Sequence, residues 1–233
     1  GHQVFICNDL QDHTALFNLR DQDVVRALEK QYQSGFLSYC NFAALPLDID
    51  AYFFSFNPTQ EAEALDVVQK LKMRTIIHPK LMINASTFGL NGTEKLKAVV
   101  TKDHWVYFPD ISQEGQAFKR VTSASKVIIG CADQQAQGDL EEMLRPLFPR
   151  QQQYLFMPVL DAEFTKLSIS GMLATRISYM NDLASVAEKL GIDIEQVRQG
   201  MAADNRIGSA YLFPGVGVGG ENFSHDIRNL THA

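Results

Sequence analysis

The sequence predicts an α/β fold in which a parallel β-sheet with helices on both faces is followed by an α-helical domain. Over residues 1–160, short apolar runs alternate with amphipathic runs that have helical spacing. Parallel strands need a crossover between them, usually a helix, so this alternation is typical of a parallel sheet. Beyond residue 160 the alternation ends and one long helical pattern begins. We therefore expect two domains, residues 1–160 and residues 161–233.

The same pattern locates the elements of the first domain. The expected strands are 4–7, 51–56, 81–85, 105–108, 126–131 and 154–157. The expected helices are 23–33, 59–71, 90–99 and 135–147. This order of elements predicts a Rossmann-like layer.

The sequence opens inside such a layer and not at its usual beginning. A Rossmann dinucleotide site starts with a strand, a GxGxxG turn and a helix. Here the text opens at GHQVFICND, which resembles the second strand, so the first βα unit is expected to be missing. Either the sequence is a fragment of a longer gene or the protein has lost the unit. A fragment is favoured, because loss would leave an uncovered sheet edge.

The last third of the chain has the pattern of a helical domain. Apolar residues recur at spacings of three and four at Leu173, Ile177, Met180, Leu183, Ala187 and Leu190. Gly191 is expected to end this long helix. Asp193 is expected to cap the next helix, with Gln196 in the capping-box position. The stripe indicates a helix that is buried or faces a second subunit.

A glycine-rich segment, PGVGVGGENFSHD, runs from Pro214 to Asp226. Glycine accepts positive φ and lets a ligand approach the backbone closely. The segment therefore indicates a loop around a bound molecule, and a flexible surface turn is the alternative.

Composition excludes several kinds of partner. The chain has 233 residues, 45% of them hydrophobic, and a net charge of −6. An acidic chain lacks the basic footprint that nucleic acid or an anionic membrane needs. No apolar run approaches the roughly 20 residues that span a bilayer, and the N-terminus lacks the pattern of a signal peptide. We therefore expect a cytoplasmic protein with neither nucleic acid nor membrane as partner.

The three cysteines, Cys7, Cys40 and Cys131, are far apart in the sequence and lack metal-ligand spacing. Two of them lie in apolar runs. They are expected to be buried thiols without a redox or zinc role, and no metal site is expected.

Three motifs together resemble the nucleotide-sugar dehydrogenase family, the UDP-glucose and GDP-mannose 6-dehydrogenases. They are a helix that holds Lys166 and IxYMND, then DNRIG at Asp204 to Gly208, then the glycine segment that ends at Asp226. The resemblance covers the chain weakly at first and strongly from about Glu163 onward. It implies NAD as cofactor, a nucleotide sugar as substrate, and a homodimer whose core is the long helix.

The sequence departs from this family at one decisive position. In the family a cysteine thiolate traps the intermediate aldehyde, so that two hydride transfers convert the sugar C6 alcohol to a carboxylate. This chain has Asn222 there. An amide is not a nucleophile at neutral pH, so the covalent step is expected to be lost. Asn222 is then either a ligand contact or a polar turn residue.

The resemblance implies further catalytic positions, with mixed retention. Lys166 matches the catalytic lysine, Ser170 replaces an asparagine one turn later, and Asp226 is retained. Thr87 matches a threonine that positions water, and Glu114 matches an acidic residue, with Asp110 as a shortened form of another. The alternatives are a surface lysine at Lys166, an N-cap at Thr87 and a surface charge at Glu114. Helical periodicity also places Ser170 and Asn181 on one face with Lys166.

The implied cofactor and substrate contacts form two further sets. The cofactor-binding positions are Asn8, Asp9, Pro58 and Thr87. Phe56 either fills space meant for the cofactor or packs at a strand end. The substrate-binding positions are Arg206, Tyr211, Gly217, Gly219 and Gly220.

Two functional hypotheses therefore stand. The chain is either an impaired NAD-dependent nucleotide-sugar 6-dehydrogenase or a catalytically silent homologue that binds a sugar nucleotide or serves a structural or regulatory role. A different β-hydroxyacid dehydrogenase is a weaker third, because those enzymes do not usually carry this glycine loop.

Overall fold

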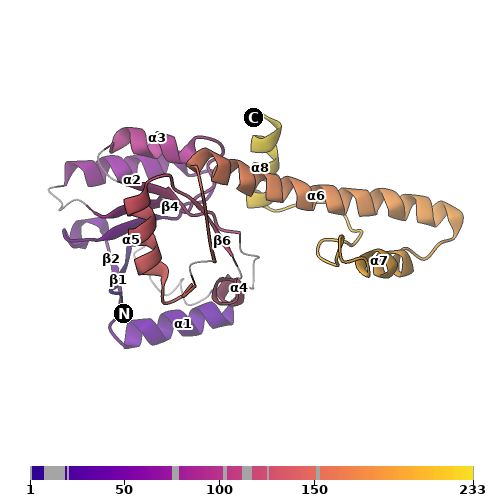
Figure 1. Cartoon of the computed structure of the whole chain (residues 1–233), viewed down its shortest axis with the longest axis horizontal. Helices are drawn as coiled ribbons and strands as arrows, with labels where there is room; N and C mark the ends of the chain where they lie inside the picture. The colour runs from indigo at the N-terminus through magenta and orange to yellow at the C-terminus, as the bar shows by residue number, and fades with distance from the viewer. Residues whose placement is uncertain are drawn as a thin grey trace.

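The computed structural model describes residues 2–7, 19, 21–74, 79–101, 104–111, 117–124, 126–150 and 153–232. Strands and covering helices form one body, and a single long helix, α6, extends from it (Figure 1). Helix α7 lies beside the far end of α6, and α8 crosses α6 near the sheet (Figure 1). No helix in the described ranges is both long and apolar enough to cross a membrane.

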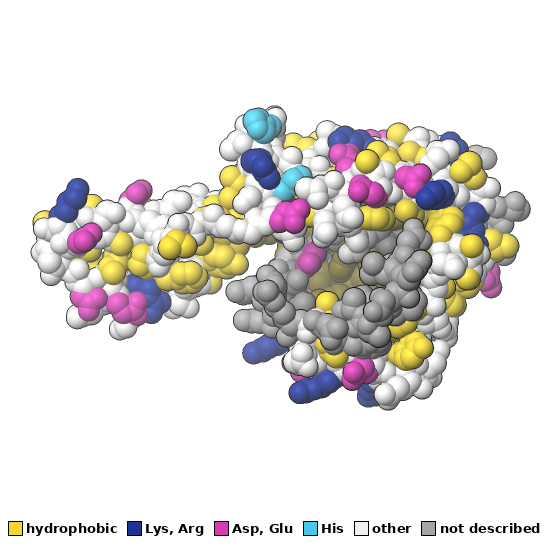
Figure 2. All heavy atoms as spheres, turned by 180° about the vertical axis from the view of Figure 1, so that it is seen from behind, with side chains coloured by type: hydrophobic (Ala, Val, Ile, Leu, Met, Phe, Trp, Pro, Cys, Tyr) yellow, Lys and Arg dark blue, Asp and Glu magenta, His cyan; other side chains and the backbone are white. Residues whose placement is uncertain are grey.

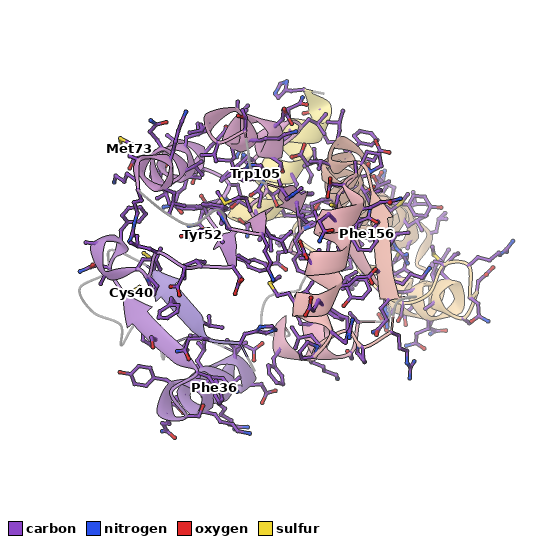
Figure 3. All side chains as sticks on the ribbon, turned by 60° about the vertical axis from the view of Figure 1, so that its left-hand side comes forward. Phe36, Cys40, Tyr52, Met73, Trp105 and Phe156 are labelled. Atoms are coloured by element: carbon purple, nitrogen blue, oxygen red, sulfur yellow. The ribbon has the colours of Figure 1, made fainter. Side chains whose placement is uncertain are left out.

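The strands form two sheets and not one. They are β1 (Val4–Cys7), β2 (Leu37–Cys40), β3 (Ala51–Phe54), β4 (Leu81–Asn84), β5 (Trp105–Tyr107), β6 (Val127–Gly130) and β7 (Tyr154–Met157). Strands β1 and β2 pair with each other, and β3 to β7 form a five-stranded sheet in chain order. The two-stranded sheet, marked by Cys40, lies apart from the β3 strand marked by Tyr52 (Figure 3).

The six expected strands are confirmed, and β2 was missed. Its four residues, LSYC, include two polar ones and lack the length of an apolar run. Pairing is parallel throughout except between β5 and β6, which are antiparallel and pair only at Tyr107 and Gly130. The expectation of a purely parallel sheet is therefore wrong at this one junction. The α/β fold with a C-terminal helical part is confirmed.

The expected helices are also present. The helices are α1 (Gln22–Gln33), α2 (Glu61–Met73), α3 (Gly92–Val99), α4 (Ala117–Thr122), α5 (Gln134–Leu144), α6 (Val159–Leu190), α7 (Ile194–Ala202) and α8 (Glu221–Thr231). The short α4 was not predicted. Helix α8 corrects the interpretation of the glycine segment, because the loop ends at Gly220 and everything from Glu221 to Asp226 is helical.

Both faces of the five-stranded sheet are buried. Strand β4 shows why, because Leu81 and Ile83 join one core cluster while Met82 between them joins the other. Alternate side chains of a strand point to opposite faces. Helices α2 and α3 supply residues to the cluster of Met82, and α5 supplies residues to the cluster of Leu81 and Ile83. This two-sided burial is the pattern of a sheet layered between helices.

The long helix ends, and the next helix begins, where the sequence predicts. Gly191 has a φ of 67° and donates its backbone N–H to Glu188, which closes the last turn of α6. Asp193 then caps α7 by accepting from the N–H of Glu195 at 2.9 Å. Gln196 donates to the Asp193 carboxylate at 3.2 Å, and so supports the cap side chain.

The prediction that all three cysteines are buried is wrong for two of them. Cys131 is buried, but Cys7 is exposed and Cys40 is half-buried. Cys7 and Cys40 both belong to the two-stranded sheet, whereas Cys131 follows β6 of the larger sheet.

The start of α6 packs closely on the sheet at Gly130. A Cβ there would lie 2.9 Å from the Val159 Cα and 3.0 Å from the Cβ atoms of Ala162 and Tyr107. Only a residue without a side chain lets α6 begin so close to β5 and β6.

We predict that Gly130→Ala lowers the free energy of unfolding by about 1–3 kcal/mol, because the added methyl group meets backbone and packed side chains. The matched control is Gly138→Ala in the exposed surface of α5, where nothing lies within 4 Å of the added Cβ. That change should stabilise by about 0.5–1 kcal/mol, since glycine disfavours a helix. Urea unfolding measures both. Equal effects of the two substitutions would contradict this account of the α6 junction.

Candidate functional site

A buried carboxylate lies where α8 crosses α6. Asp226 of α8 is 1% exposed. Its Oδ2 accepts a hydrogen bond from the Ser170 hydroxyl at 2.7 Å and lies 3.5 Å from the Lys166 Nζ. The expected grouping of Lys166, Ser170 and Asp226 is thus present, and we call these three residues the α6–α8 cluster.

The other oxygen of Asp226 has no such partner. Its Oδ1 is buried and accepts no hydrogen bond within the described part of the chain. A buried acceptor without a partner costs free energy and calls for an explanation. Lys166 remains partly exposed, its side chain being 16% accessible, so the cluster is not sealed. The cluster can therefore offer a carboxylate oxygen and an ammonium group to a polar ligand.

A small residue on α6 allows the two helices to meet. A Cβ at Gly171 would lie 2.6 Å from the Leu230 Cδ2 of α8. The neighbouring Ser170 is also small, so the backbones of α6 and α8 approach closely enough for a short serine hydroxyl to reach Asp226.

The loop after β4 brings Thr87 to the same region. The Thr87 side chain hydrogen-bonds Tyr107, a fully buried residue of β5. Burial raises the pKa of Tyr107, and the nearby carboxylates of Glu163, Asp226 and Asp110 raise it further, although the Thr87 hydrogen bond opposes them. The hydrogen bond from Thr87 and the charge of Asp226 therefore both act on one buried tyrosine.

Helix α8 also touches this loop directly. A Cβ at Gly89 would lie 3.0 Å from the Asn229 side chain, which in turn contacts the His225 ring at 2.9 Å. The first residue of α8 meets the segment between β3 and α2, because the Thr59 hydroxyl donates to Glu221 Oε1 at 3.3 Å. The segment after β3 therefore contacts the beginning of α8, and the loop after β4 contacts α8 near its end.

Glu163 is a structural residue of this region that the sequence analysis missed. It is 3% exposed and accepts from the backbone N–H groups of Asn91 at 2.7 Å and Thr93 at 2.8 Å. It thus caps α3 from the first turns of α6. Burial raises the pKa of Glu163, and the hydrogen bonds from Thr93 and Asn91 oppose that rise. No local motif marks a cap that comes from 70 residues away.

Asn181 anchors the beginning of the glycine loop. Its side-chain oxygen accepts the backbone N–H of Gly215 at 2.8 Å. Gly217 and Gly220 have φ values of 119° and 96°, which favour glycine, whereas Gly219 needs no such conformation. A Cβ added at any of these glycines would meet nothing within 4 Å, so the loop is open to the exterior.

The DNRIG turn is held by α6 as well. Arg176 donates to the carbonyl oxygens of Ile207 and Gly208 at 2.8 and 3.0 Å. Arg206 is highly exposed and paired with Asp204 at 2.6 Å, which lowers the pKa of that carboxyl group. Tyr211 adopts a φ of 56°, unusual for a residue other than glycine, and its ring stacks on Phe213. Arg206 and Tyr211 therefore lie on the segment between α7 and the glycine loop and not in the α6–α8 cluster.

Asn222 is exposed in the first turn of α8. It precedes Asp226 by four residues, so both lie on one side of the helix. The alternative of a polar turn residue is wrong, because position 222 is helical.

The proposed cofactor positions are only partly described. Asn8, Asp9 and Glu114 lie outside the described residues. Pro58 is buried in the turn before α2, and Thr87 is half-buried. Phe56 packs against the core cluster that includes Tyr52 and Phe54, as the packing alternative expects.

Comparison with known proteins shows which family the chain resembles. Residues 160–233 match the model of the UDP-glucose/GDP-mannose dehydrogenase family, central domain. A UDP-glucose 6-dehydrogenase of Pseudomonas aeruginosa is 38% identical over 125 residues, which are 54% of this chain and 28% of that protein. One from Bacillus subtilis is 37% identical over 124 residues, which are 53% of this chain and 27% of that protein. The chain is therefore similar to the nucleotide-sugar dehydrogenase family, and residues 160–233 match its central domain.

Solved structures of this family share the fold. A UDP-glucose dehydrogenase from Pyrobaculum islandicum superposes with a TM-score of 0.80 at 23% identity, over 99% of this chain and 58% of that one. A GDP-mannose dehydrogenase from Pseudomonas aeruginosa gives 0.72 at 19% identity, over 100% and 59%. At these identities the likeness establishes the fold. The chain thus spans somewhat over half the length of these solved structures. Its matches to the curated relatives cover about a quarter of their length.

We predict that Ser170→Ala destabilises the chain by about 1.5–3 kcal/mol, because it removes a hydrogen bond to a buried charged group. Ser185→Ala on the exposed side of α6 is the matched control, since the Ser185 hydroxyl bonds only the Asn181 carbonyl oxygen of its own helix. It should stay within about 0.5 kcal/mol of the parent. Chemical denaturation gives both values. A loss at Ser170 no larger than at Ser185 would show that Asp226 does not depend on this hydroxyl.

Proposed function

We propose that this chain binds a nucleotide sugar beside the α6–α8 cluster and that it is an impaired NAD-dependent nucleotide-sugar 6-dehydrogenase. The observation that carries the proposal is the buried Asp226 Oδ1 without a hydrogen-bond partner in the described part, next to the Lys166 ammonium group. A sugar hydroxyl, as both donor and acceptor, suits such a pair of groups. UDP-glucose and GDP-mannose, after which the matching family is named, belong to this chemical class.

The chain's own residues supply part of the oxidation chemistry. Lys166 can stabilise negative charge on the oxygen of an alcohol that loses a proton, and the carboxylate of Asp226 can accept a hydrogen bond from a hydroxyl or a water. Asn222, one turn before Asp226, is placed to donate a hydrogen bond from its amide. It cannot form the thiohemiacetal that a cysteine forms, so the second oxidation step lacks its covalent route.

The proposal includes NAD because of the family resemblance. NAD would supply the hydride acceptor, and Pro58 in the turn before α2 and Thr87 in the loop after β4 would contact it. However, a dinucleotide site needs a strand followed by a glycine turn that binds the pyrophosphate. In the described part of the chain, no strand pairs with both β1 and β3 to carry such a turn. The described residues therefore do not fit a complete dinucleotide site, and no step is assigned to NAD.

A silent, sugar-nucleotide-binding homologue is the second candidate. Asn222 favours it, because this residue affects redox chemistry and leaves the α6–α8 cluster and the glycine loop in place. Such a protein would serve as a structural or regulatory partner in polysaccharide precursor synthesis, with a cytoplasmic location as for the enzyme.

Binding of a sugar nucleotide can be measured directly. Titration calorimetry with UDP-glucose, UDP-N-acetyl sugars and GDP-mannose should detect binding of one of them. Asp226→Asn should weaken that binding about tenfold or more, because the sugar hydroxyl loses a charged acceptor. Met73→Ala, a highly exposed position on α2, is the control for the variant's effect.

The same samples test the reaction. With NAD present, uronic acid should not form, since Asn222 cannot carry the covalent intermediate. Release of a 6-aldehyde would support the impaired enzyme, and binding without any NADH would support the silent homologue. Formation of a uronic acid by the unmodified chain would contradict the assigned effect of Asn222, and failure of every sugar nucleotide to bind would overturn the proposed function.

The second prediction concerns the homodimer. Apolar side chains gather on the arm formed by α6 and α7 (Figure 2). On α6 the exposed ones include Met172, Tyr179 and Val186, spaced by seven residues, as on a helix face that packs on another helix. We propose that this face forms the dimer, and that Tyr179→Glu with Val186→Glu yields a monomer in light scattering. Met73→Glu, equally exposed but on α2, should leave the dimer intact. An unmodified chain that is monomeric at tens of micromolar would contradict this.

A further inference from the structure

The two-stranded sheet brings together two cysteines that are distant in the sequence. Cys7 ends β1, Cys40 ends β2, and the two are Cα partners in the parallel register. Cys7 is exposed and Cys40 is half-buried. We propose that Cys7 and Cys40 form a dithiol site that reacts with small-molecule disulfides and closes to an intramolecular disulfide.

The strand register supplies the spacing that a disulfide needs. Neighbouring strands lie about 4.7–4.9 Å apart. The Cα atoms of a disulfide lie about 4.4–6.8 Å apart, so directly paired residues of two strands fall inside that range. The pair is the last that the described residues of β1 form with β2.

The two side chains share one face of this sheet. Paired residues on adjacent strands point to the same face, and residues two apart on one strand do so as well. Phe5, two residues before Cys7, and Cys40 both pack against the same core cluster. A shift of register by one residue would separate the two thiols, but three preceding pairs, from Val4 with Leu37 onward, hold it.

The exchange is balanced in atoms and electrons. The Cys7 thiolate attacks one sulfur of the small-molecule disulfide, whose S–S bond breaks and releases one thiolate that takes up the Cys7 proton. The Cys40 thiol then loses its proton and attacks the Cys7 sulfur, which breaks the mixed disulfide and releases the second small thiol. One small disulfide is reduced to two thiols, and two cysteines are oxidised to one cystine.

Cys131 provides an internal control for this chemistry. It is buried, and burial raises its pKa, which keeps it in the unreactive thiol form. It also lies on the five-stranded sheet, beyond β6, while the dithiol lies on the other sheet. Oxidation should therefore leave one thiol of the three in the chain.

The test treats the full chain with oxidised glutathione, alkylates the remaining thiols after denaturation, and maps the peptides by mass spectrometry without reduction. The expected product is a linked Cys7–Cys40 peptide with alkylated Cys131, and dithiothreitol should restore three alkylated cysteines.

Single variants separate the two steps. Cys40→Ser should stop at a glutathione adduct on Cys7, because no second thiol displaces it, and Cys131→Ser should still give the linked peptide. Retention of glutathione on Cys7 in the unmodified chain would overturn the proposal. A disulfide-linked pair of chains through Cys7 in place of the internal link would also overturn it.

Discussion

The burial of the Asp226 carboxylate is the constraint on which the site depends. Removing a carboxylate from water costs several kcal/mol even after relaxation, and loss of one partner of a buried pair costs about 3–5 kcal/mol. Asp226 is stable only because Ser170 and Lys166 reach its Oδ2 from α6. The position of α8 on α6 is thereby fixed. The exposed Asn222 and the glycine loop before it are held in place by the same contact, since they precede Asp226 directly.

Helix α6 connects this cluster to the sheet. At its beginning, Gly130 lets it pack on β6, and Glu163 caps α3 through two backbone hydrogen bonds. Lys166 comes about one turn after Glu163 and Ser170 about two turns after it, and further along Asn181 anchors the loop at Gly215. A single rigid helix therefore sets the distance between the loop after β4, which holds Thr87, and the glycine loop. This arrangement supports the proposed binding of a sugar nucleotide by the last third of the chain.

Much of the fold could be predicted from the sequence, and the reasons are local. Apolar runs located six of the strands, and the helical stripe, Gly191 and Asp193 located the end of α6 and the start of α7. Strand β2 was missed because four residues of mixed polarity carry little pattern. The contacts that tie distant segments together could not be predicted: the cap from Glu163 to α3 and the pairing of Cys7 with Cys40 depend on topology, which a linear pattern does not contain. The family resemblance, and not periodicity, pointed to Lys166, Ser170 and Asp226.

A crystal structure of the chain with its sugar nucleotide would test the central claim most directly. The account predicts that the C6 hydroxyl of the sugar lies within hydrogen-bond distance of the Lys166 Nζ or the Asp226 Oδ1, with the Asn222 amide beside C6 and no covalent bond to it. A sugar nucleotide bound away from the α6–α8 cluster, with Asp226 Oδ1 still lacking a partner, would contradict it.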